Sequence, residues 1–358
     1  MKSKNLRPSE LPGDARPRLR RLRHRLEWLA VVCLRGLVRA CPLAAVRAAA
    51  DALGWLGSHL DRRGRRTALE NLRVVYGAAM DEAARKRLVT ANYRRFARTF
   101  LEMFWTARLR KDQAEAGRWW TLTSDDLPAV EEAAAKGAVF VTPHFGNFEW
   151  LATGLGFHGH SVMIVAQDFK NPLLTPVFSR ERARAGHEIV PQQMAMIRLF
   201  RHVARGGSVA LLPDLTTKPT QAAAVVRCFG RPVSVTTAHI HLALRTGRPL
   251  VPSVCLPAEG GRYRLHFCRP LWIAPGTPPW RAAQACWDVF EPLVRQHPEF
   301  WLWIYKHWRY LPADADPADF PAYANRSRAF DRLAASQPAS PPTPPAPAPA
   351  AFPGENPR

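Results

Sequence analysis

Short apolar runs alternate with stretches of helical periodicity from residue 137 onward. Six of these runs favour β-strands, and they span residues 137–143, 161–166, 208–213, 225–229, 250–256 and 263–268. Strands that alternate with helices along the chain are typical of βαβ units. The pattern therefore predicts an α/β fold with a mostly parallel central sheet flanked by helices.

The N-terminal part has an amphipathic pattern instead. Residues 26–60 predict two helical pieces on either side of Cys41 and Pro42, with Leu and Trp on one face and Arg on the other. The longest uncharged run before Arg35 has seven residues, whereas a membrane-spanning helix needs about 20. A central Arg would also cost roughly 2.5 to 3.5 kcal/mol on insertion. We therefore expect these helices to be membrane-associated at the surface rather than to span the bilayer.

Residues 81–107 predict a longer amphipathic helix that begins near Asp81 and Glu82. Its basic face carries Arg85, Lys86, Arg94, Arg95 and Arg98. A basic face of this kind is as often simply a solvated surface.

The two ends of the chain have compositions that oppose packing. Residues 1–25 contain nine Lys or Arg against two acidic residues, and residues 336–358 contain nine prolines. We expect a basic disordered arm and a Pro-rich disordered tail. Residues 61–320 are then the predicted catalytic domain. The apolar segment after the arm has no small-residue cleavage site, so we expect no removable secretory signal.

Composition limits the choice of partners. The chain of 358 residues has a net charge of +22, so its surface should attract nucleic acid, anionic lipid headgroups or an acidic carrier protein. Its six cysteines form no C-x-x-C pair and no zinc-ligand spacing. We expect reduced cysteines, no metal and no cofactor.

The candidate chemistry follows the first predicted strand of this α/β region. His144 comes directly after Thr142 and Pro143, just beyond the carboxyl end of the strand, where α/β folds place functional groups. Glu149 lies five positions later, so the two side chains can meet if His144 is in the loop and Glu149 in the first helical turns. An imidazole can accept a hydroxyl proton near neutral pH, and a carboxylate on its other nitrogen fixes the tautomer. We predict that His144 is a general base oriented by Glu149.

The backbone around this pair also suggests a role. Gly146 permits close backbone approach, and amides at the start of the following helix could face a developing oxyanion. The His-x4-Glu spacing alone is a weak signal, because 12 His and 29 acidic residues produce such matches by chance.

The whole string from His144 to Glu149 after a buried strand is more specific. It resembles the signature of the lipid A biosynthesis late acyltransferase family, the lauroyl and myristoyl transferases, within the wider glycerolipid acyltransferase-like fold. Similar segments continue in the family's order over roughly residues 26–310. They comprise residues 66–72, Glu102, residues 182–186, 207–214, 228–237, 242–252 and 298–303, and Trp308 with Arg309.

The resemblance implies an activity and a set of partners. In that family an acyl chain passes from acyl carrier protein to a hydroxyl of a glucosamine-based lipid precursor. By resemblance His144 is the base and Glu149 its partner. Arg182 would hold an anionic substrate group and Asp214 would support the pocket, with Gly146 and Asn147 also on the substrate side. The implied location is the cytoplasmic face of the bacterial inner membrane, beside anionic lipids.

Three departures from the family pattern leave the acceptor open. Leu215 stands where Gln usually follows the aspartate, Tyr305-Lys306-His307 replaces a His-Arg-Arg pattern, and the N-terminal segment is unusually rich in Arg. An alternative is the same chemistry on a lysophospholipid, a glycosylated phosphoinositide or an aminolipid.

Two other classes of protein fit less well. A nucleic-acid-binding protein would agree with the charge, but the sequence contains no recognition helix, zinc module or RNP-like motif, and we expect no nucleic acid as a partner. A serine hydrolase would need a Gly-x-Ser-x-Gly elbow, and residues 206–210 lack the final glycine. Direct transfer without a covalent enzyme intermediate is the simpler expectation.

Overall fold

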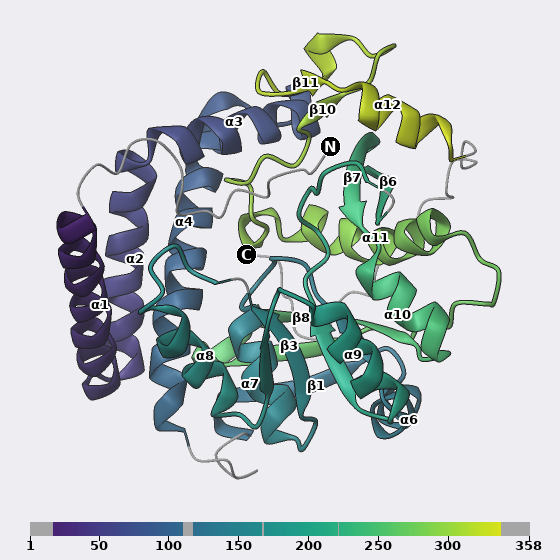
Figure 1. Cartoon of the computed structure of the whole chain (residues 1–358). Helices are drawn as coiled ribbons and strands as arrows, with labels where there is room; N and C mark the ends of the chain where they lie inside the picture. Colours follow the sequence, from purple (N-terminus) through teal and green to yellow (C-terminus); the bar gives the residue numbers. More distant parts are fainter. Residues whose placement is uncertain (1–16, 110–116, 167, 221, 338–358) are drawn as a thin grey trace.

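A seven-stranded sheet forms the centre of the protein in the computed structural model, which describes residues 17–109, 117–166, 168–220 and 222–337 (Figure 1). The strand order is β1-β9-β8-β2-β5-β3-β4. Neighbouring strands run parallel except β8 and β9, which are antiparallel. The strands are β1 (Trp120–Ser124), β2 (Val139–Val141), β3 (Val162–Ala166), β4 (Glu188–Pro191), β5 (Ser208–Leu211), β8 (Leu250–Pro257) and β9 (Tyr263–Phe267). The α/β fold with a mostly parallel sheet is confirmed.

Two small sheets accompany the central one. An antiparallel hairpin consists of β6 (Ala223–Cys228) and β7 (Arg231–Thr236), and a short parallel pair consists of β10 (Tyr310–Leu311) and β11 (Asn325–Arg326). All six predicted apolar runs contain a strand. Strands β1, β4, β7, β10 and β11 were not predicted.

Eleven α-helices are seen within the described ranges. They are α1 (Pro17–Ala40), α2 (Leu43–Leu60), α3 (Arg62–Tyr76), α4 (Glu82–Trp105), α6 (Leu127–Lys136), α7 (Phe148–Phe157), α8 (Thr175–Ala183), α9 (Ala195–Ala204), α10 (Ala238–Thr246), α11 (Pro279–Gln296) and α12 (Arg328–Ala335). Short 3₁₀ turns lie at Gly77–Ala79, Thr106–Arg108, Glu259–Gly261, Pro298–Phe300 and Pro317–Asp319.

Each face of the sheet packs into its own hydrophobic core, because successive side chains of a strand point to opposite faces. Val139 and Val141 of β2 belong to one core, and Phe140 belongs to the other. The first core is covered by α9, α10 and α11, and the second by α6, α7 and α8. The protein thus has three layers, helix on sheet on helix.

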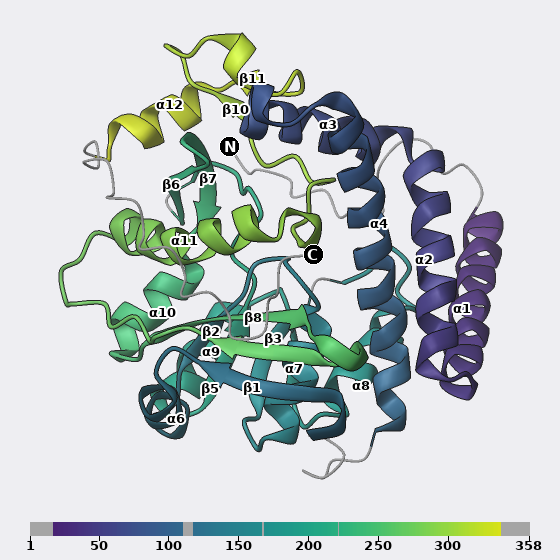
Figure 2. The same cartoon turned by 180° about the vertical axis from the view of Figure 1, so that it is seen from behind.

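Helix α4 links the N-terminal helices to this body. It begins at the predicted position, since the Asp81 side chain caps it by accepting a hydrogen bond from the Ala84 amide. Figure 2 shows α4 against the body, α2 beside it and α1 outside both. Gly54 lets α2 approach closely, because a Cβ there would lie 2.4 Å from the Arg94 Cα.

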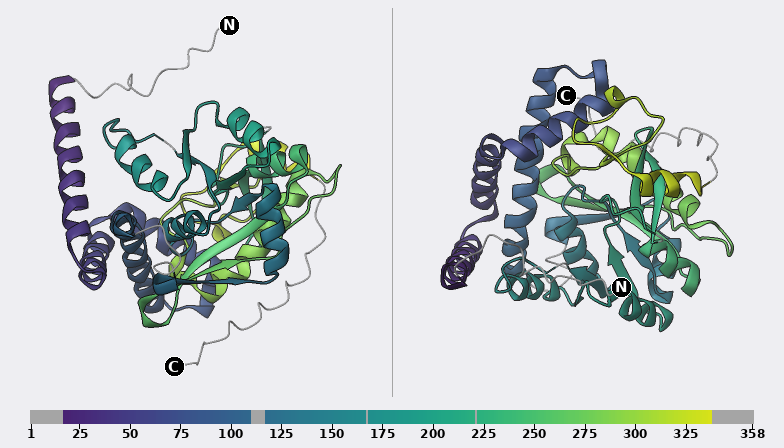
Figure 3. Two further views of the ribbon diagram at one scale, coloured as in Figure 1. Left: turned by 90° about the horizontal axis from the view of Figure 1, so that it is seen from below. Right: turned by 45° about the horizontal axis from the view of Figure 1, so that its top comes forward.

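Helix α1 begins earlier than expected. It includes residues 17–25, which we assigned to a disordered arm, while residues 1–16 and 338–358 lie outside the described residues. The predicted break at Cys41 and Pro42 is confirmed. Figure 3 shows α1 as the outermost element of its side. Within the described residues, no helix is both long enough and apolar enough to cross a membrane.

The packed chain continues past residue 320, where we placed the end of the catalytic domain. Phe330 of α12 is fully buried and stacks on Tyr310 with ring centroids 5.2 Å apart. This aromatic contact attaches α12 to the body.

Candidate active site

His144 and Asp214 meet at the carboxyl edge of the central sheet. His144 lies three residues beyond β2 and Asp214 three residues beyond β5, and these strands are parallel neighbours. The His144 Nδ1 atom is 2.7 Å from Asp214 Oδ1, and the His144 amide donates to Asp214 Oδ2 at 2.9 Å. Side chain and backbone of His144 are therefore held by the same carboxylate.

The surroundings of Asp214 keep it ionised. Its side chain is 1% exposed, and Trp301 Nε1 donates to Oδ2 at 3.0 Å. Burial alone would raise the pKa of Asp214, but the charge of His144 and its hydrogen bonds outweigh burial and lower that pKa. An ionised carboxylate only accepts hydrogen bonds, so Nδ1 of His144 carries the hydrogen. The Nε2 lone pair is then free to accept a proton.

A second histidine lies close to this pair and stays neutral. His307 stacks on Trp301 with ring centroids 4.0 Å apart, and its Nε2 donates to the Leu302 carbonyl at 2.8 Å. Burial lowers the pKa of His307 to about 4, although the charge of Asp214 opposes this.

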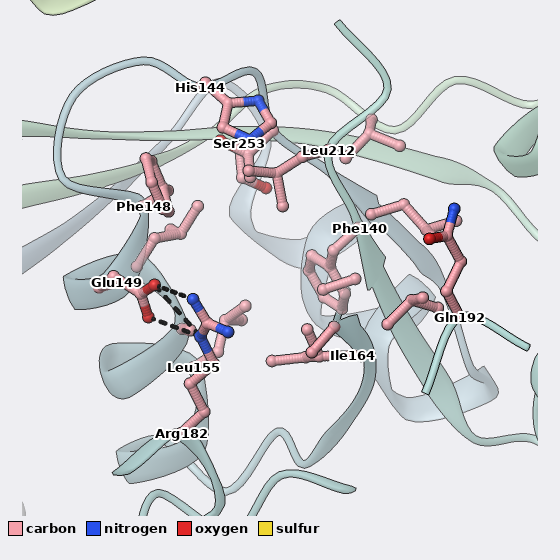
Figure 4. A pocket seen from close by; sticks show the side chains of 18 of the residues that line it. Phe140, His144, Phe148, Glu149, Leu155, Ile164, Arg182, Gln192, Leu212 and Ser253 are labelled. Carbon is pink, nitrogen blue, oxygen red and sulfur yellow. Dashed lines mark hydrogen bonds and ion pairs between the residues drawn. The ribbon is translucent and has the colours of Figure 1, made fainter. Parts of the chain in front are cut away.

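A largely apolar cavity of about 530 Å³ opens beside His144. Its wall comes from the sheet and from α7, and it includes Phe140, Phe148, Leu151, Leu155, Ile164 and Leu211. Figure 4 shows His144 at one end of this cavity, with Glu149 and Arg182 on one wall and Phe140 and Ile164 across from them. We call this space the acyl cavity, because apolar walls of this size suit a hydrocarbon chain.

Glu149 does not contact His144 as we expected. Its carboxylate, in the first turn of α7, binds Arg182 of α8, with Oε1 2.6 Å from Arg182 Nη2 and both oxygens 3.2 Å from Nε. No hydrogen bond to His144 is formed by Glu149 within the described structure. Burial lowers the pKa of Arg182, but the charge and hydrogen bonds of Glu149 outweigh it and raise that pKa. The carboxylate that orients His144 is therefore Asp214, which corrects the predicted pairing.

Gly146 shapes the turn after His144. Its φ is +64°, and a Cβ there would lie 2.0 Å from the Cys255 carbonyl oxygen. The predicted close approach of the backbone is thus to strand β8. The Gly146 amide donates to Phe300 and the Asn147 amide to Cys255, so neither faces a substrate. The free amides of the first turn, judged over the described residues, are those of Phe148 and Glu149.

Asn147 has a supporting position and does not line the acyl cavity. Its Oδ1 caps α7 by accepting from the Trp150 amide, and its Nδ2 donates to Glu102 Oε2 at 3.2 Å and to the Tyr263 hydroxyl at 3.1 Å. Glu102 is fully buried and also binds Arg47 Nε at 2.7 Å. This network joins α2, α4 and β9 to the helix that carries Glu149.

One group of side chains resembles a metal site in composition. Asp125, His266 and Cys268 place one ligand atom each within 4.8 Å of one another, and no second group of this kind occurs in the parts that the structure describes. The His266 Nε2 atom already lies 3.2 Å from Asp125 Oδ1. The group contributes nothing to the acyl cavity.

A histidine held by a buried carboxylate thus lies at the end of an apolar cavity, an arrangement that suits proton transfer beside a hydrocarbon chain. The comparison with known families agrees with this arrangement. Residues 14–310 match the model of the bacterial lipid A biosynthesis acyltransferases. The chain belongs to that family and is an acyltransferase. No curated protein matches the chain significantly.

Proposed function

We propose that the protein transfers a fatty acyl chain from acyl carrier protein to a hydroxyl of a lipid A precursor, with His144 as the general base. The observation that carries this proposal is the 2.7 Å contact between His144 Nδ1 and Asp214 beside the acyl cavity. It leaves Nε2 as the proton acceptor, at the end of a space suited to the chain being transferred.

The reaction follows from this geometry. Nε2 of His144 removes the proton of the acceptor hydroxyl while its oxygen attacks the thioester carbonyl carbon. Asp214 stabilises the imidazolium that forms. When the tetrahedral intermediate collapses, the C–S bond breaks and the imidazolium returns its proton to the departing thiolate. General-base catalysis of this kind contributes about 10² to 10⁴ in rate.

The first turn of α7 can stabilise the negative charge of the intermediate. The amides of Phe148 and Glu149 have no acceptor within the described residues, and they lie at the positive end of the helix dipole. Glu149 neutralises Arg182 in the wall of the acyl cavity, so we assign it the task of keeping that wall ordered around the chain.

Direct transfer agrees with the side chains of the acyl cavity. Ser253 lies on its wall, but its hydroxyl donates to the Val251 carbonyl at 3.1 Å. Burial raises the pKa of Cys228, Cys255, Cys268 and Cys286, so these thiols stay protonated. No stable acyl-enzyme should form at any of these positions.

The exposed apolar side chains of the N-terminal helices support a membrane location. Such residues on α1 and α2 include Leu22, Leu26, Leu29, Leu53, Leu56 and Leu60. Leucines on one side of a cationic helix, as in α1, favour the membrane interface. We place the enzyme at the cytoplasmic face of the bacterial inner membrane, where acyl carrier protein and a growing lipid can meet.

The experiment is acyl transfer with purified protein, acyl carrier protein thioesters and a panel of lipid hydroxyl acceptors, read by mass spectrometry. We expect acylated lipid A precursor with the native chain and a loss of at least about 100-fold with His144→Ala. A native chain that acylates only a lysophospholipid or an aminolipid would contradict the acceptor. Full activity of His144→Ala would contradict the mechanism.

A further inference from the structure

Helices α2 and α4 enclose a second concave surface, distinct from the acyl cavity. This space of about 570 Å³, which we call the α2–α4 groove, shares no lining residue with that cavity. Its lining holds one carboxylate, that of Asp51, against six Arg or Lys side chains. These are Arg65, Lys86, Arg87, Arg94, Arg95 and Arg98. The groove is therefore strongly positive.

Few of these charges are neutralised by the protein itself. Asp51 is occupied by Arg98, whose Nε lies 2.6 Å from Oδ1, and Lys86 pairs with Glu82 at 2.6 Å. Over the described residues, Arg87, Arg94 and Arg95 form no ion pair. Several unneutralised guanidinium groups in one concave site favour an anion with several oxygens, such as a phosphate.

Arg95 is the most constrained of the three. It is only partly exposed, and its guanidinium lies 5.0 Å from the centre of the Phe300 ring. Burial and the neighbouring charge of Arg98 lower the pKa of Arg95, and the charges of Glu299 and Asp51 offset this only in part. An anion in the groove would relieve this repulsion.

The groove borders an apolar helix face. Trp55 lines the groove and is about half exposed, while Leu53, Leu56 and Leu60 of α2 are exposed as well. Figure 2 shows α2 and α4 side by side at the same edge of the molecule as α1. Trp at the headgroup level, Leu in the acyl region and Arg at the phosphates are the arrangement expected at a bilayer surface.

We propose that the α2–α4 groove binds the phosphate of an anionic membrane phospholipid and thereby holds α2 against the bilayer. This site lies outside the acyl cavity, and its occupancy does not depend on the acyl transfer proposed above.

The test is sedimentation of the full chain with vesicles of phosphatidylcholine alone and of phosphatidylcholine with phosphatidic acid. Arg87→Gln/Arg94→Gln removes two exposed side chains of the groove without breaking an ion pair. Arg245→Gln/Arg281→Gln removes the same charge from α10 and α11, on the opposite side of the molecule (Figure 1). We expect the groove variant to bind the phosphatidic acid vesicles about tenfold or more weakly than the native chain. The control variant should stay within about threefold.

Two competition measurements distinguish a specific binding site from general electrostatic attraction to the membrane. Soluble dihexanoyl phosphatidic acid should displace the native chain from phosphatidic acid vesicles, and dihexanoyl phosphatidylcholine should not. Equal losses for the groove and control variants would overturn the proposal, as would unchanged binding of the groove variant. A groove variant with native vesicle binding but a raised KM for the acyl carrier protein thioester would assign the surface to the carrier, and the proposal would be wrong. None of the vesicle readings requires acyl transfer, so their failure is distinct from a failure of the proposed enzyme activity.

Discussion

Two buried carboxylates at the candidate active site have different tasks. Asp214 contacts His144 Nδ1, so it sets the tautomer of the base. Glu149 binds Arg182 through both of its oxygens, so it neutralises a cation in the wall of the acyl cavity. The first contact acts on the imidazole that we propose as the base, and the second acts on the wall of the acyl cavity.

This division predicts how Glu149→Gln behaves. The substitution leaves the Arg182 charge without its partner in a mostly buried site, and we expect a loss of about 3 kcal/mol or more in the free energy of unfolding. Glu149→Gln/Arg182→Gln removes both charges and should recover much of that loss. Urea unfolding in detergent measures both variants. A Glu149→Gln protein of native stability with the activity of His144→Ala would mean that Glu149 acts on the base after all.

The buried histidines predict a pH dependence of stability. Burial lowers the pKa of His239 to about 3 and that of His307 to about 4, so both are neutral in the folded protein and take up protons on unfolding below pH 6.5. The two histidines contribute fully to the free energy of unfolding above pH 6.5, and this contribution is lost as the pH falls toward 4. By pH 5 the loss is about 2 kcal/mol for each histidine.

The urea concentration at the midpoint of unfolding, measured between pH 7.5 and pH 5, tests this loss of stability. Most carboxylates titrate below this pH range and therefore contribute little to the change. His239→Leu should reduce the loss of stability between pH 7.5 and pH 5 by about 2 kcal/mol. Its buried Nδ1 has no hydrogen-bond partner in the described structure, and Leu can fill the site. An identical slope for the native chain and this variant would contradict the account.

Sequence alone could find His144 but not its carboxylate. The apolar run ending at Pro143 placed His144 beyond a strand, and the same reasoning places Asp214 beyond the run of residues 208–213. Their contact depends on β2 and β5 being neighbours in the sheet. Strand order comes from packing over the whole chain and not from local spacing. The nearby Glu149 was therefore the natural but incorrect choice for the carboxylate on Nδ1.

Two arginines join helix α1 to the body of the protein. In the sequence, their charge served only as an argument against a membrane-spanning helix. Arg35 and Arg39 reach Glu181 of α8 at 3.5 Å and 2.5 Å. The Glu181 side chain is nearly fully buried, so these pairs are better shielded from water than ordinary surface ion pairs. Since α8 also carries Arg182, this contact links the N-terminal helix to the wall of the acyl cavity.

Glu181→Ala should release α1. We expect amide hydrogen exchange over residues 17–40 to become faster by about tenfold or more, because two arginines lose their common partner beside a buried site. The matched control is Glu188→Ala, whose partner Arg198 is about half exposed. Equal protection of α1 in both variants would show that Glu181 does not hold the helix.

The elements that were predicted and those that were missed differ in burial. Strands β2 and β8 lie inside the sheet and have nearly continuous apolar sequences, so their pattern was visible. Strands β1 and β4 are the two outer strands, and they contain exposed or polar positions. An edge strand pairs with only one neighbouring strand, and part of it faces solvent. Its sequence therefore contains fewer consecutive apolar residues, and its strand pattern is harder to recognise.

At the scale of the whole molecule, three features agree with the proposed location at a membrane surface. They are the acyl cavity, the exposed leucines of α1 and α2 and the α2–α4 groove. The net charge of +22 fitted nucleic acid as well as lipid by itself. It includes the groove arginines that form no ion pair with the residues that the structure describes. The alternation of strands and helices predicted the body of the protein. The way in which the N-terminal helices attach to that body required the structure.

The most direct test of the central claim is kcat for acyl transfer by Asp214→Asn. The Asn amide would donate to Nδ1 and leave the hydrogen on Nε2, so His144 could no longer accept a proton. We predict a fall in kcat of about 10² to 10⁴, close to that of His144→Ala, with retained binding of the acyl thioester as evidence of folding. A kcat within tenfold of the native value would contradict the assignment of His144 and Asp214 as the catalytic pair.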